Sequence, residues 1–463
     1  MPTRVPASPS PTTAETVSRL RRQVRGRVVT PGDDDYDRAR SVFYGGLDRR
    51  PAAVVQVLDA GDVARVVSFA ADGGHELAVR GGGHSAVGHG VSDGGVTIDL
   101  SHLRDLEIDP DGRSAWAATG LTAGEYTAAV GAHGLATGFG DTGTVGIGGI
   151  TLGGGVGFLV RRHGLTVDSL LAAEVVTADG SLRRVDLEHE PDLFWALRGG
   201  GGNVGVATRL RFRLHEVPSV LGGMLVLPAT PDVIASLLVE AEVAGDDLSL
   251  IANVMTAPPM PFLAPEHHGR PVVMVLLAHC GAETVAEREV ARLRSLATPL
   301  ADQLGRIPYA GMFPPEPEGY RPTGVSRTMF ADAVDRARAE RVLDALATSS
   351  APMAVAQLRV LGGAMARVPA DATAFAHRDR RLMVNVAALY EDPAERPAHE
   401  AWVRALSAEL ADGPGAYVNF LGDDGAARIH EAYPGDTWDR LVAVKRRYDP
   451  GNLFRLNHNV PPA

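Results

Sequence analysis

A run of three glycines, 81–83, constrains this chain most strongly, because it leaves the backbone bare between Arg80 and His84. The apolar segment 76–80 before it has the length and composition of a buried strand. Without Cβ atoms the loop can adopt positive φ angles and close its N–H groups on an anion. Arg80 adds a cation on one side and His84 a nucleophilic ring nitrogen on the other. The pattern favours a loop that holds a phosphate-bearing cofactor; a mobile turn that ends in a surface histidine fits the same residues.

Two other glycine-rich segments, 138–143 and 200–205, match the dinucleotide-binding pattern G-x-G-x-x-G. Neither leads from a strand straight into a long helix with an acidic residue about 20 positions on, as a Rossmann site requires. No glycine loop ends in Gly-Lys-Ser/Thr, which excludes the phosphate loop of nucleotide hydrolases. The sequence instead predicts several glycine loops that approach one extended ligand from different sides.

The net charge of the chain makes some classes of binding partner unfavourable. A net charge of −11 disfavours nucleic acid and anionic membrane surfaces as partners. No apolar run approaches the roughly 18 residues of a membrane span, and segment 1–16 is interpreted as a disordered tail and not as a signal peptide. Cys280 is the only cysteine, so no intrachain disulfide forms, and no metal site is predicted. We expect a soluble, cytoplasmic protein, monomeric or homo-oligomeric, that binds a small molecule.

Two or three domains are expected from 463 residues. In the first 216 residues short strands alternate with helices. Asp62 is expected to cap a helix over 62–71, and Thr122 to open a capping box for a helix over 122–132. Residues 173–185 are predicted to form a hairpin.

After residue 216 glycine becomes rarer and helices alternate with apolar strands, which is typical of an α+β domain whose sheet is covered by helices on one face. The expected helices are 231–244, 283–297 and 331–347. The expected strands are 248–255, 271–280 and 382–390. Lys445 and Arg446 are predicted to be surface charges on a helix near the C-terminus.

Several motifs, taken in order, resemble the FAD-linked oxidases of the vanillyl-alcohol oxidase (PCMH-type) superfamily, in particular the berberine-bridge-enzyme-like branch. They are 80–85, 144–149, 152–157, 416–420 and 448–459. The resemblance covers nearly the whole chain after the tail, and it implies a two-domain α+β fold with a PCMH-type FAD-binding domain. The second domain would be an α+β substrate domain, an antiparallel sheet covered by helices. The expected boundaries are a tail 1–16, an FAD-binding domain 17–216, a substrate-binding domain 217–414 and a C-terminal segment 415–463 that returns to the FAD domain.

The resemblance implies that FAD is covalently bound. In the family, the histidine that matches His84 is joined through a ring nitrogen to the 8α carbon of the flavin; the alternative for His84 is a non-covalent contact with the pyrophosphate. Many relatives have a second tether from a cysteine, and here Thr142 occupies that position. We therefore expect a single 8α-histidyl link and no cysteinyl link. Val145 matches the position where a small residue admits oxygen beside the flavin, or it is an ordinary packing residue.

The other cofactor contacts implied by the resemblance come from all the glycine-rich motifs and from the C-terminal segment. They are Arg80, Gly81, Gly82, Gly83, Ser85, Gly88, Gly120, Asp141, Thr144, Gly146, Gly148, Gly149, Gly154, Gly157, Gly205, Val206, Asn457 and Asn459. His458 stands where relatives often have glutamine.

Catalysis in the family removes a hydride from a carbon that carries an OH or an amine, while a base takes the proton. Tyr417 matches a tyrosine that faces the flavin in many relatives, and it is otherwise a core aromatic. A phenol with a pKa near 10 needs a cation or a shared hydrogen bond to act as a base near neutral pH. Asn419 is a candidate partner of the substrate or the flavin. His377 is a weaker candidate for binding or base, since a lone loop histidine is usually solvated.

The resemblance implies an FAD-dependent oxidoreductase. The favoured reaction is that of an oxidase, in which a small or medium organic substrate is oxidised and O₂ becomes H₂O₂. One alternative is a dehydrogenase of the same fold that uses another electron acceptor. A second is a flavin-binding or flavin-sequestering protein without turnover, although Tyr417 and a large second domain have no purpose in a mere carrier.

Overall fold

The computed structural model describes residues 13–317 and 319–463. Most of the expected tail, 1–12, lies outside the described residues, and helix α1 (Thr13–Gln23) begins at Thr13. Within the described part of the chain, no helix is both long enough and apolar enough to cross a membrane.

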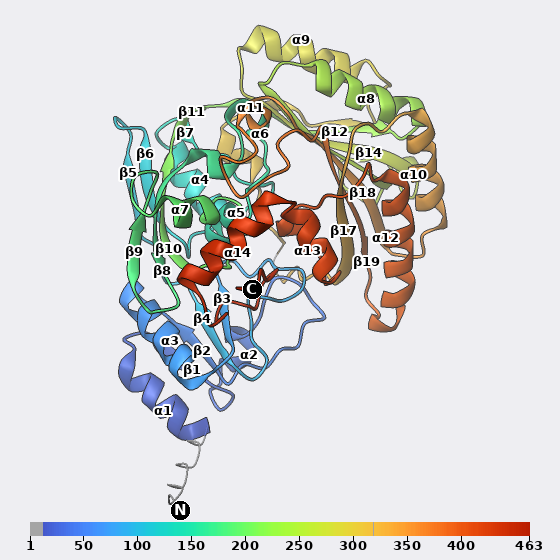
Figure 1. Cartoon of the computed structure of the whole chain (residues 1–463). Helices are drawn as coiled ribbons and strands as arrows, with labels where there is room; N and C mark the ends of the chain where they lie inside the picture. Colours follow the sequence, from blue (N-terminus) through green and yellow to red (C-terminus); the bar gives the residue numbers. More distant parts are fainter. Residues whose placement is uncertain (1–12, 318) are drawn as a thin grey trace, which may run out of the picture.

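The N-terminal part of the chain forms two sheets of more than two strands (Figure 1). The first has the order β1-β2-β4-β3 and contains β1 (Arg27–Val29), β2 (Ala53–Gln56), β3 (Leu77–Arg80) and β4 (Val96–Asp99). Strand β4 runs parallel to both β2 and β3. Helix α3 (Ala60–Gly73) packs Val63, Val66 and Val67 against the apolar side chains of this sheet. The sheet thereby fixes β3, the strand that enters the glycine run.

The cap of α3 differs from the prediction. Asp59 caps the helix, and its side chain accepts a hydrogen bond from the Asp62 N–H. The Asp62 carboxylate is fully buried and accepts hydrogen bonds from the N–H groups of Arg25 and Gly26. Asp62 therefore anchors the segment before β1, a contact about 36 residues away that no local pattern could show.

The second sheet is antiparallel throughout, with the order β5-β6-β10-β8-β9. The predicted hairpin over 173–185 is confirmed as β8 and β9. A two-stranded sheet pairs β7 with β11. The strands are β5 (Leu106–Asp109), β6 (Ser114–Ala118), β7 (Leu135–Ala136), β8 (Leu170–Val176), β9 (Leu182–Val185), β10 (Val206–Arg213) and β11 (His215–Glu216). The helices around them are α2 (Tyr36–Ala39), α4 (Ala123–Gly131), α5 (Ile147–Leu152), α6 (Val160–His163) and α7 (Pro191–Leu197).

Helix α4 has the predicted capping box, in which Thr122 accepts from the Glu125 N–H and the Glu125 carboxylate accepts from the Thr122 N–H. Thr122→Ala is expected to lower the free energy of unfolding by about 0.5–2 kcal/mol, because an N–H of the first turn loses its acceptor. Urea denaturation checks this value. The exposed Thr256 serves as a control whose replacement by Ala should change little.

The following part of the chain forms one antiparallel sheet with the path β15-β12-β14-β13-β18-β19-β17, to which β16 adds by pairing with β12. Helices α8, α9, α10 and α12 lie along one face of it (Figure 1). The strands are β12 (Val220–Pro228), β13 (Leu248–Thr256), β14 (Pro271–His279), β15 (Ala301–Asp302), β16 (Gly305–Ile307), β17 (Gly324–Ala331), β18 (Met353–Val360) and β19 (Leu382–Leu389). The helices are α8 (Pro231–Val243), α9 (Glu283–Arg294), α10 (Arg336–Thr348), α11 (Ala364–Arg367) and α12 (Arg396–Leu410).

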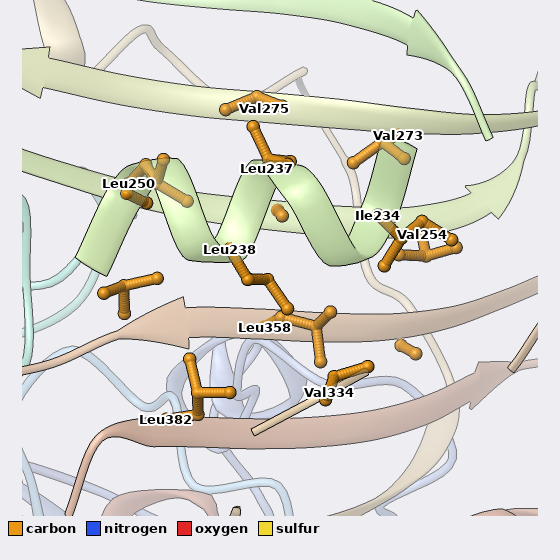
Figure 2. Close-up of a cluster of buried hydrophobic side chains, with 14 of the residues drawn as sticks. Ile234, Leu237, Leu238, Leu250, Val254, Val273, Val275, Val334, Leu358 and Leu382 are labelled. Carbon is orange, nitrogen blue, oxygen red and sulfur yellow. The ribbon is translucent and has the colours of Figure 1, made fainter. Parts of the chain in front are cut away.

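A large cluster of apolar side chains fills most of the space between this sheet and its helices. Figure 2 shows Ile234, Leu237 and Leu238 of α8 packed over side chains such as Val275 and Leu358 of the strands. The predicted helix over 331–347 starts too early, since Ala331 ends β17 and the helix begins at Arg336 behind its cap Asp335.

The C-terminal residues leave this sheet and pack against the N-terminal part. Ala416, Leu441 and Val460 belong to the same apolar cluster as strands β6, β8 and β10. The elements here are α13 (Ala426–Ala432) and α14 (Asp436–Tyr448). Short 3-10 helices complete the chain: η1 (Thr166–Ser169), η2 (Pro265–His267), η3 (Tyr309–Met312), η4 (Pro393–Glu395) and η5 (Val418–Phe420).

Lys445 corrects the prediction of a surface charge. Its side chain is 0% exposed, and Nζ donates to Asp449 Oδ2 at 2.7 Å and to the carbonyls of Asn203 and Phe454 at 2.8 and 2.7 Å. Burial lowers the pKa of Lys445, and the ion pair with Asp449 opposes that change. Its neighbour Arg446 is exposed, as predicted. Lys445 therefore joins the C-terminal segment to the loop that precedes β10.

Candidate active site

The glycine run after β3 touches the 144–149 motif backbone to backbone. A Cβ on Gly82 would lie 2.2 Å from the Gly146 nitrogen, and one on Gly146 would lie 2.3 Å from the Gly82 nitrogen. Only glycine fits at either position without moving a main chain, because real Cβ atoms never approach so closely. The two motifs, about 60 residues apart in the chain, therefore form one surface, with His84 on one loop and Thr144 on the other.

His84 is held as a neutral imidazole. Its ring stacks on Phe43 at a centroid distance of 4.0 Å. Burial lowers the pKa of His84 to about 4, against a smaller opposing effect of a hydrogen bond with the Thr144 backbone. At neutral pH the ring therefore carries an unprotonated nitrogen, which is the form that can act as a nucleophile.

The Arg80 side chain is bound within the protein. Its guanidinium is 8% exposed and donates to Asp99 Oδ2 at 2.9 Å and to the Ser41 carbonyl at 3.0 Å. These contacts hold the end of β3 against β4. Within the loop that follows, Ser85 Oγ accepts from the His89 N–H, so both predicted polar neighbours of His84 bind the protein itself.

Three buried polar atoms of the predicted cofactor contacts have no hydrogen-bond partner among the described residues. They are Thr144 Oγ1, Asn457 Oδ1 and Asn459 Oδ1. Buried polar atoms in proteins are nearly always paired, so each of these fits contact with a polar ligand. Asn457 is fixed by donation from Nδ2 to the Gly202 and Phe454 carbonyls. The residues present therefore fit a cofactor rich in polar atoms, such as FAD.

Three other predicted contacts, Gly120, Gly205 and Val206, lie at or next to the ends of strands β6 and β10. Gly205 packs closely on β8, where its Cβ would meet Val175 and Val176, and Val206 opens β10. A Cβ on Gly120 would lie 2.0 Å from the Leu100 carbonyl. These glycines allow strands and loops to approach each other closely.

The large sheet of β12–β19 contributes a row of polar side chains on the face opposite its helices. Asn253 of β13 pairs with Gln357 of β18, which pairs with Asn385 of β19, which pairs with Thr328 of β17. Gln357 Nε2 donates to Asn253 Oδ1 at 3.0 Å. Asn385 Oδ1 and Thr328 Oγ1 are buried and have no hydrogen-bond partner among the described residues. We call these four residues the polar row.

Arg359 connects the polar row to the cofactor loops. It lies two residues after Gln357 on the same face of β18 and donates to Gln357 Oε1. Its Nη2 is 2.6 Å from Asp141 Oδ2, and its guanidinium lies 5.1 Å from the centre of the Phe420 ring. Asp141, a predicted cofactor contact, thus pairs with the cation that binds Gln357 of the polar row, and the adjacent Thr142 hydroxyl turns to Asp141.

Tyr417 lies next to this group and is 2% exposed. Its hydroxyl oxygen accepts hydrogen bonds from Asn419 Nδ2 at 2.9 Å, the Gly155 N–H at 3.0 Å and the Val156 N–H at 3.4 Å. Burial raises the pKa of the Tyr417 hydroxyl, while these hydrogen bonds and the charge of Arg359 act against the rise. Tyr417 and Asn419, both predicted site residues, therefore contact each other, and Arg359 is near enough for its charge to act on the Tyr417 hydroxyl.

Two comparisons with protein families and curated relatives agree with this geometry. Residues 51–186 match the family model "FAD binding domain", and residues 416–461 match "Berberine and berberine like". The (R)-6-hydroxynicotine oxidase of Paenarthrobacter nicotinovorans is 33% identical over 460 residues, which is 95% of this chain and 97% of the relative. The chain belongs to the berberine-bridge-enzyme-like family of FAD-linked oxidoreductases.

Solved structures show the same fold. The 6-hydroxy-D-nicotine oxidase of Arthrobacter nicotinovorans superposes with a TM-score of 0.83 at 29% identity, covering 95% of this chain and 98% of that one. The berberine bridge enzyme of Eschscholzia californica gives a TM-score of 0.84 at 23% identity, covering 97% and 99%. The predicted two-domain α+β fold is confirmed, and the protein is an FAD-linked oxidoreductase.

His377 differs from the solvated loop histidine of the prediction. It is 5% exposed, lies against Phe330, and its Nε2 is 2.9 Å from the Glu431 carbonyl. Burial lowers its pKa to about 4, so the ring is neutral. The partly buried His458 ring lies against His89 at a centroid distance of 4.9 Å, and desolvation lowers its pKa to about 4 as well. Neither ring contacts the Tyr417 hydroxyl.

The polar row and Arg359 are candidate site residues that were not predicted from the sequence. A signal was present, since Asn253, Gln357, Arg359 and Asn385 interrupt strands whose other residues are mostly apolar. Alternation places them on one face of each strand. Their alignment into a single row, however, depends on a strand register that spans more than 130 residues of sequence.

Proposed function

We propose that this family member is an oxidase. It takes a hydride from a carbon that bears a hydroxyl or an amine in a small or medium organic molecule, and O₂ becomes H₂O₂. The observation that carries the proposal is the buried Tyr417 hydroxyl, whose contacts are all hydrogen-bond donors and which lies beside Arg359 near the polar row. The name of the relative that is 33% identical, an oxidase of 6-hydroxynicotine, supports this class of reaction.

His84 would bind FAD from the loop after the glycine run. Thr144 and Val145 would bind it from the 144–149 motif, and Asn457 and Asn459 from the C-terminal segment. When bound, FAD supplies the acceptor for the hydride that leaves the substrate. We propose one covalent link, from a ring nitrogen of His84 to the 8α carbon, because the neutral ring offers a free electron pair. Thr142 provides no thiol, so no cysteinyl link forms. The FAD-binding unit would comprise 17–216 and 415–463, and the substrate unit 217–414.

Tyr417 is the proposed base, which takes the proton from the substrate hydroxyl or amine. Asn419 holds the Tyr417 oxygen in place. In this proposal the polar row faces the substrate, and Asn385 and Thr328 offer it side-chain oxygens that have no partner among the described residues. His377, whose Nε2 contacts the Glu431 carbonyl, is proposed to support the wall behind Tyr417 rather than to move a proton.

The test of the covalent link is acid precipitation of the purified protein, followed by flavin fluorescence of the washed pellet. Flavin should stay in the pellet for the wild type and for Thr142→Ala, and it should wash out for His84→Ala. Flavin in the supernatant of the wild type would disprove the tether. Flavin lost only from Thr142→Ala would move the link away from His84.

The oxidase reaction itself is tested by peroxide production under air with a panel of alcohols, sugars and amines, beginning with (R)-6-hydroxynicotine. Turnover with peroxide supports the oxidase. Turnover that requires an artificial electron acceptor identifies a dehydrogenase. Bound flavin that no compound of the panel bleaches favours a flavin-sequestering protein.

A further inference from the structure

The glycines of the 152–157 motif shape a turn around the Tyr417 hydroxyl. Gly154 and Gly155 have φ angles of +121° and +83°, which lie in the left-handed region that favours glycine. A Cβ on Gly155 would lie 2.0 Å from Thr166 Oγ1, and one on Gly153 would lie 2.0 Å from Asn419 Oδ1. The turn therefore directs two successive N–H groups at the phenol and leaves room for the Asn419 amide beside it.

The hydrogen bonds at Tyr417 do not suit a neutral phenol. A tyrosine hydroxyl has one proton to donate and two electron pairs that accept. Three N–H donors converge on this oxygen, and no acceptor for its own proton is found among the described residues. A phenolate oxygen, with three electron pairs and no proton, matches the three donors. Hydrogen bonds to a charged oxygen are also stronger than those to a neutral one.

We propose that the Gly155 and Val156 N–H groups, together with Asn419, form a three-donor cup that stabilises the phenolate of Tyr417. This proposal rests on the proposed role of Tyr417 as the base, and it deepens that role. Asn419 and the glycine turn are then positioning residues: they hold the phenolate oxygen so that it receives a proton from the substrate hydroxyl or amine.

Few other groups act on the phenol electrostatically. Arg359 of β18 is the charged side chain that favours the phenolate, and it is itself paired with Asp141. The other elements packed against the ring present apolar side chains, among them Phe330, Met383 and Phe375, and the nearby His377 is neutral. The cup is therefore the main feature that opposes the rise in the pKa of Tyr417 caused by burial.

The same protein contains buried tyrosines without such donors. Tyr309 and Tyr433 are 2% and 1% exposed, and their hydroxyls have no hydrogen-bond partner among the described residues. Burial alone raises the pKa of Tyr433, and burial is the main reason that the pKa of Tyr309 is raised. These two residues are internal references of nearly equal burial for the effect of the cup.

The experiment is a pH titration of the FAD-loaded protein labelled with ¹³C at the tyrosine Cζ carbon, followed by NMR. The signal of each residue is identified by its loss in Tyr417→Phe, Tyr309→Phe or Tyr433→Phe. Tyr417 should ionise at a lower pH than Tyr309 and Tyr433. In Asn419→Ala its apparent pKa should rise by about 1–2 units, and it should rise further in Asn419→Asp, which keeps the shape but adds a like charge.

The proposal of the cup would be wrong if Tyr417 ionised at no lower pH than Tyr309 and Tyr433. It would also be wrong if the apparent pKa of Tyr417 were unchanged in both Asn419 variants. Tyr309→Phe should leave the Tyr417 titration unchanged. The titration needs no substrate, so it is independent of the proposed oxidase reaction. If Tyr417 titrates as expected while Tyr417→Phe retains full turnover, the cup stands and the base is another group.

Discussion

Tyr417→Phe is expected to lower kcat/KM by about 10²–10⁴-fold, the usual contribution of a general base. The substitution keeps the ring and its contacts with Phe375 and Phe420 but removes the oxygen that accepts the proton. FAD should remain bound, because no predicted cofactor contact is touched. The measurement is initial rate of peroxide formation with the best compound of the panel, supported by the rate of anaerobic flavin bleaching.

The matched control is Tyr309→Phe, which removes a buried hydroxyl that has no partner among the described residues, at a place far along the chain from Tyr417. It should change kcat/KM little. Equal rates for the wild type and Tyr417→Phe would exclude Tyr417 as the base. A higher KM with an unchanged kcat would instead indicate that the hydroxyl contributes to substrate binding alone.

Lys445→Met is expected to lower the free energy of unfolding by about 3–5 kcal/mol, since it leaves a buried carboxylate without its cation. Both side chains of the Lys445–Asp449 pair are 0% exposed. Methionine matches the length of the lysine stem but cannot bind Asp449 or the carbonyls of Asn203 and Phe454. Because Asn203 Nδ2 and Asn457 Nδ2 bind the same region, a smaller fraction of protein that carries FAD should accompany the loss.

Arg446 provides the control for Lys445, one residue along the same helix. It is exposed and binds only the Ala463 carbonyl among the described residues, so Arg446→Met should cost about 0–1 kcal/mol. Urea denaturation of the holoprotein compares the two variants. Equal midpoints would show that Lys445 contributes no more than a surface charge.

Local patterns identified much of this fold from the sequence. The capping box at Thr122 and the hairpin over 173–185 depend on residues a few positions apart, and both are present. The glycine motifs pointed to a cofactor because their order resembles a family. Asp62 and Lys445 were misread because distant segments bury them, and such burial has no local signature: Arg25 and Gly26 bind Asp62, and the loop that contains Asn203 covers Lys445.

The glycines of the 152–157 motif show the same limit. Gly154 and Gly157 are predicted cofactor contacts, yet the N–H of Gly155, between them, binds the hydroxyl of Tyr417, 262 residues later in the chain. A glycine pattern predicts that a backbone is bare and says nothing of which group comes close to it. The identity of that group emerged only when the C-terminal segment was placed against the turn.

The return of the C-terminal segment has a consequence for synthesis of the protein. The apolar cluster around β6, β8 and β10 is completed by Ala416, Leu441 and Val460, which all follow the sheet of β12–β19 in the chain. During translation the N-terminal part must therefore wait, with part of its core open, until these residues have been made, whereas the sheet of β12–β19 can form earlier. A chain cut before Ala416 would contain every strand of that sheet and an unfinished first half.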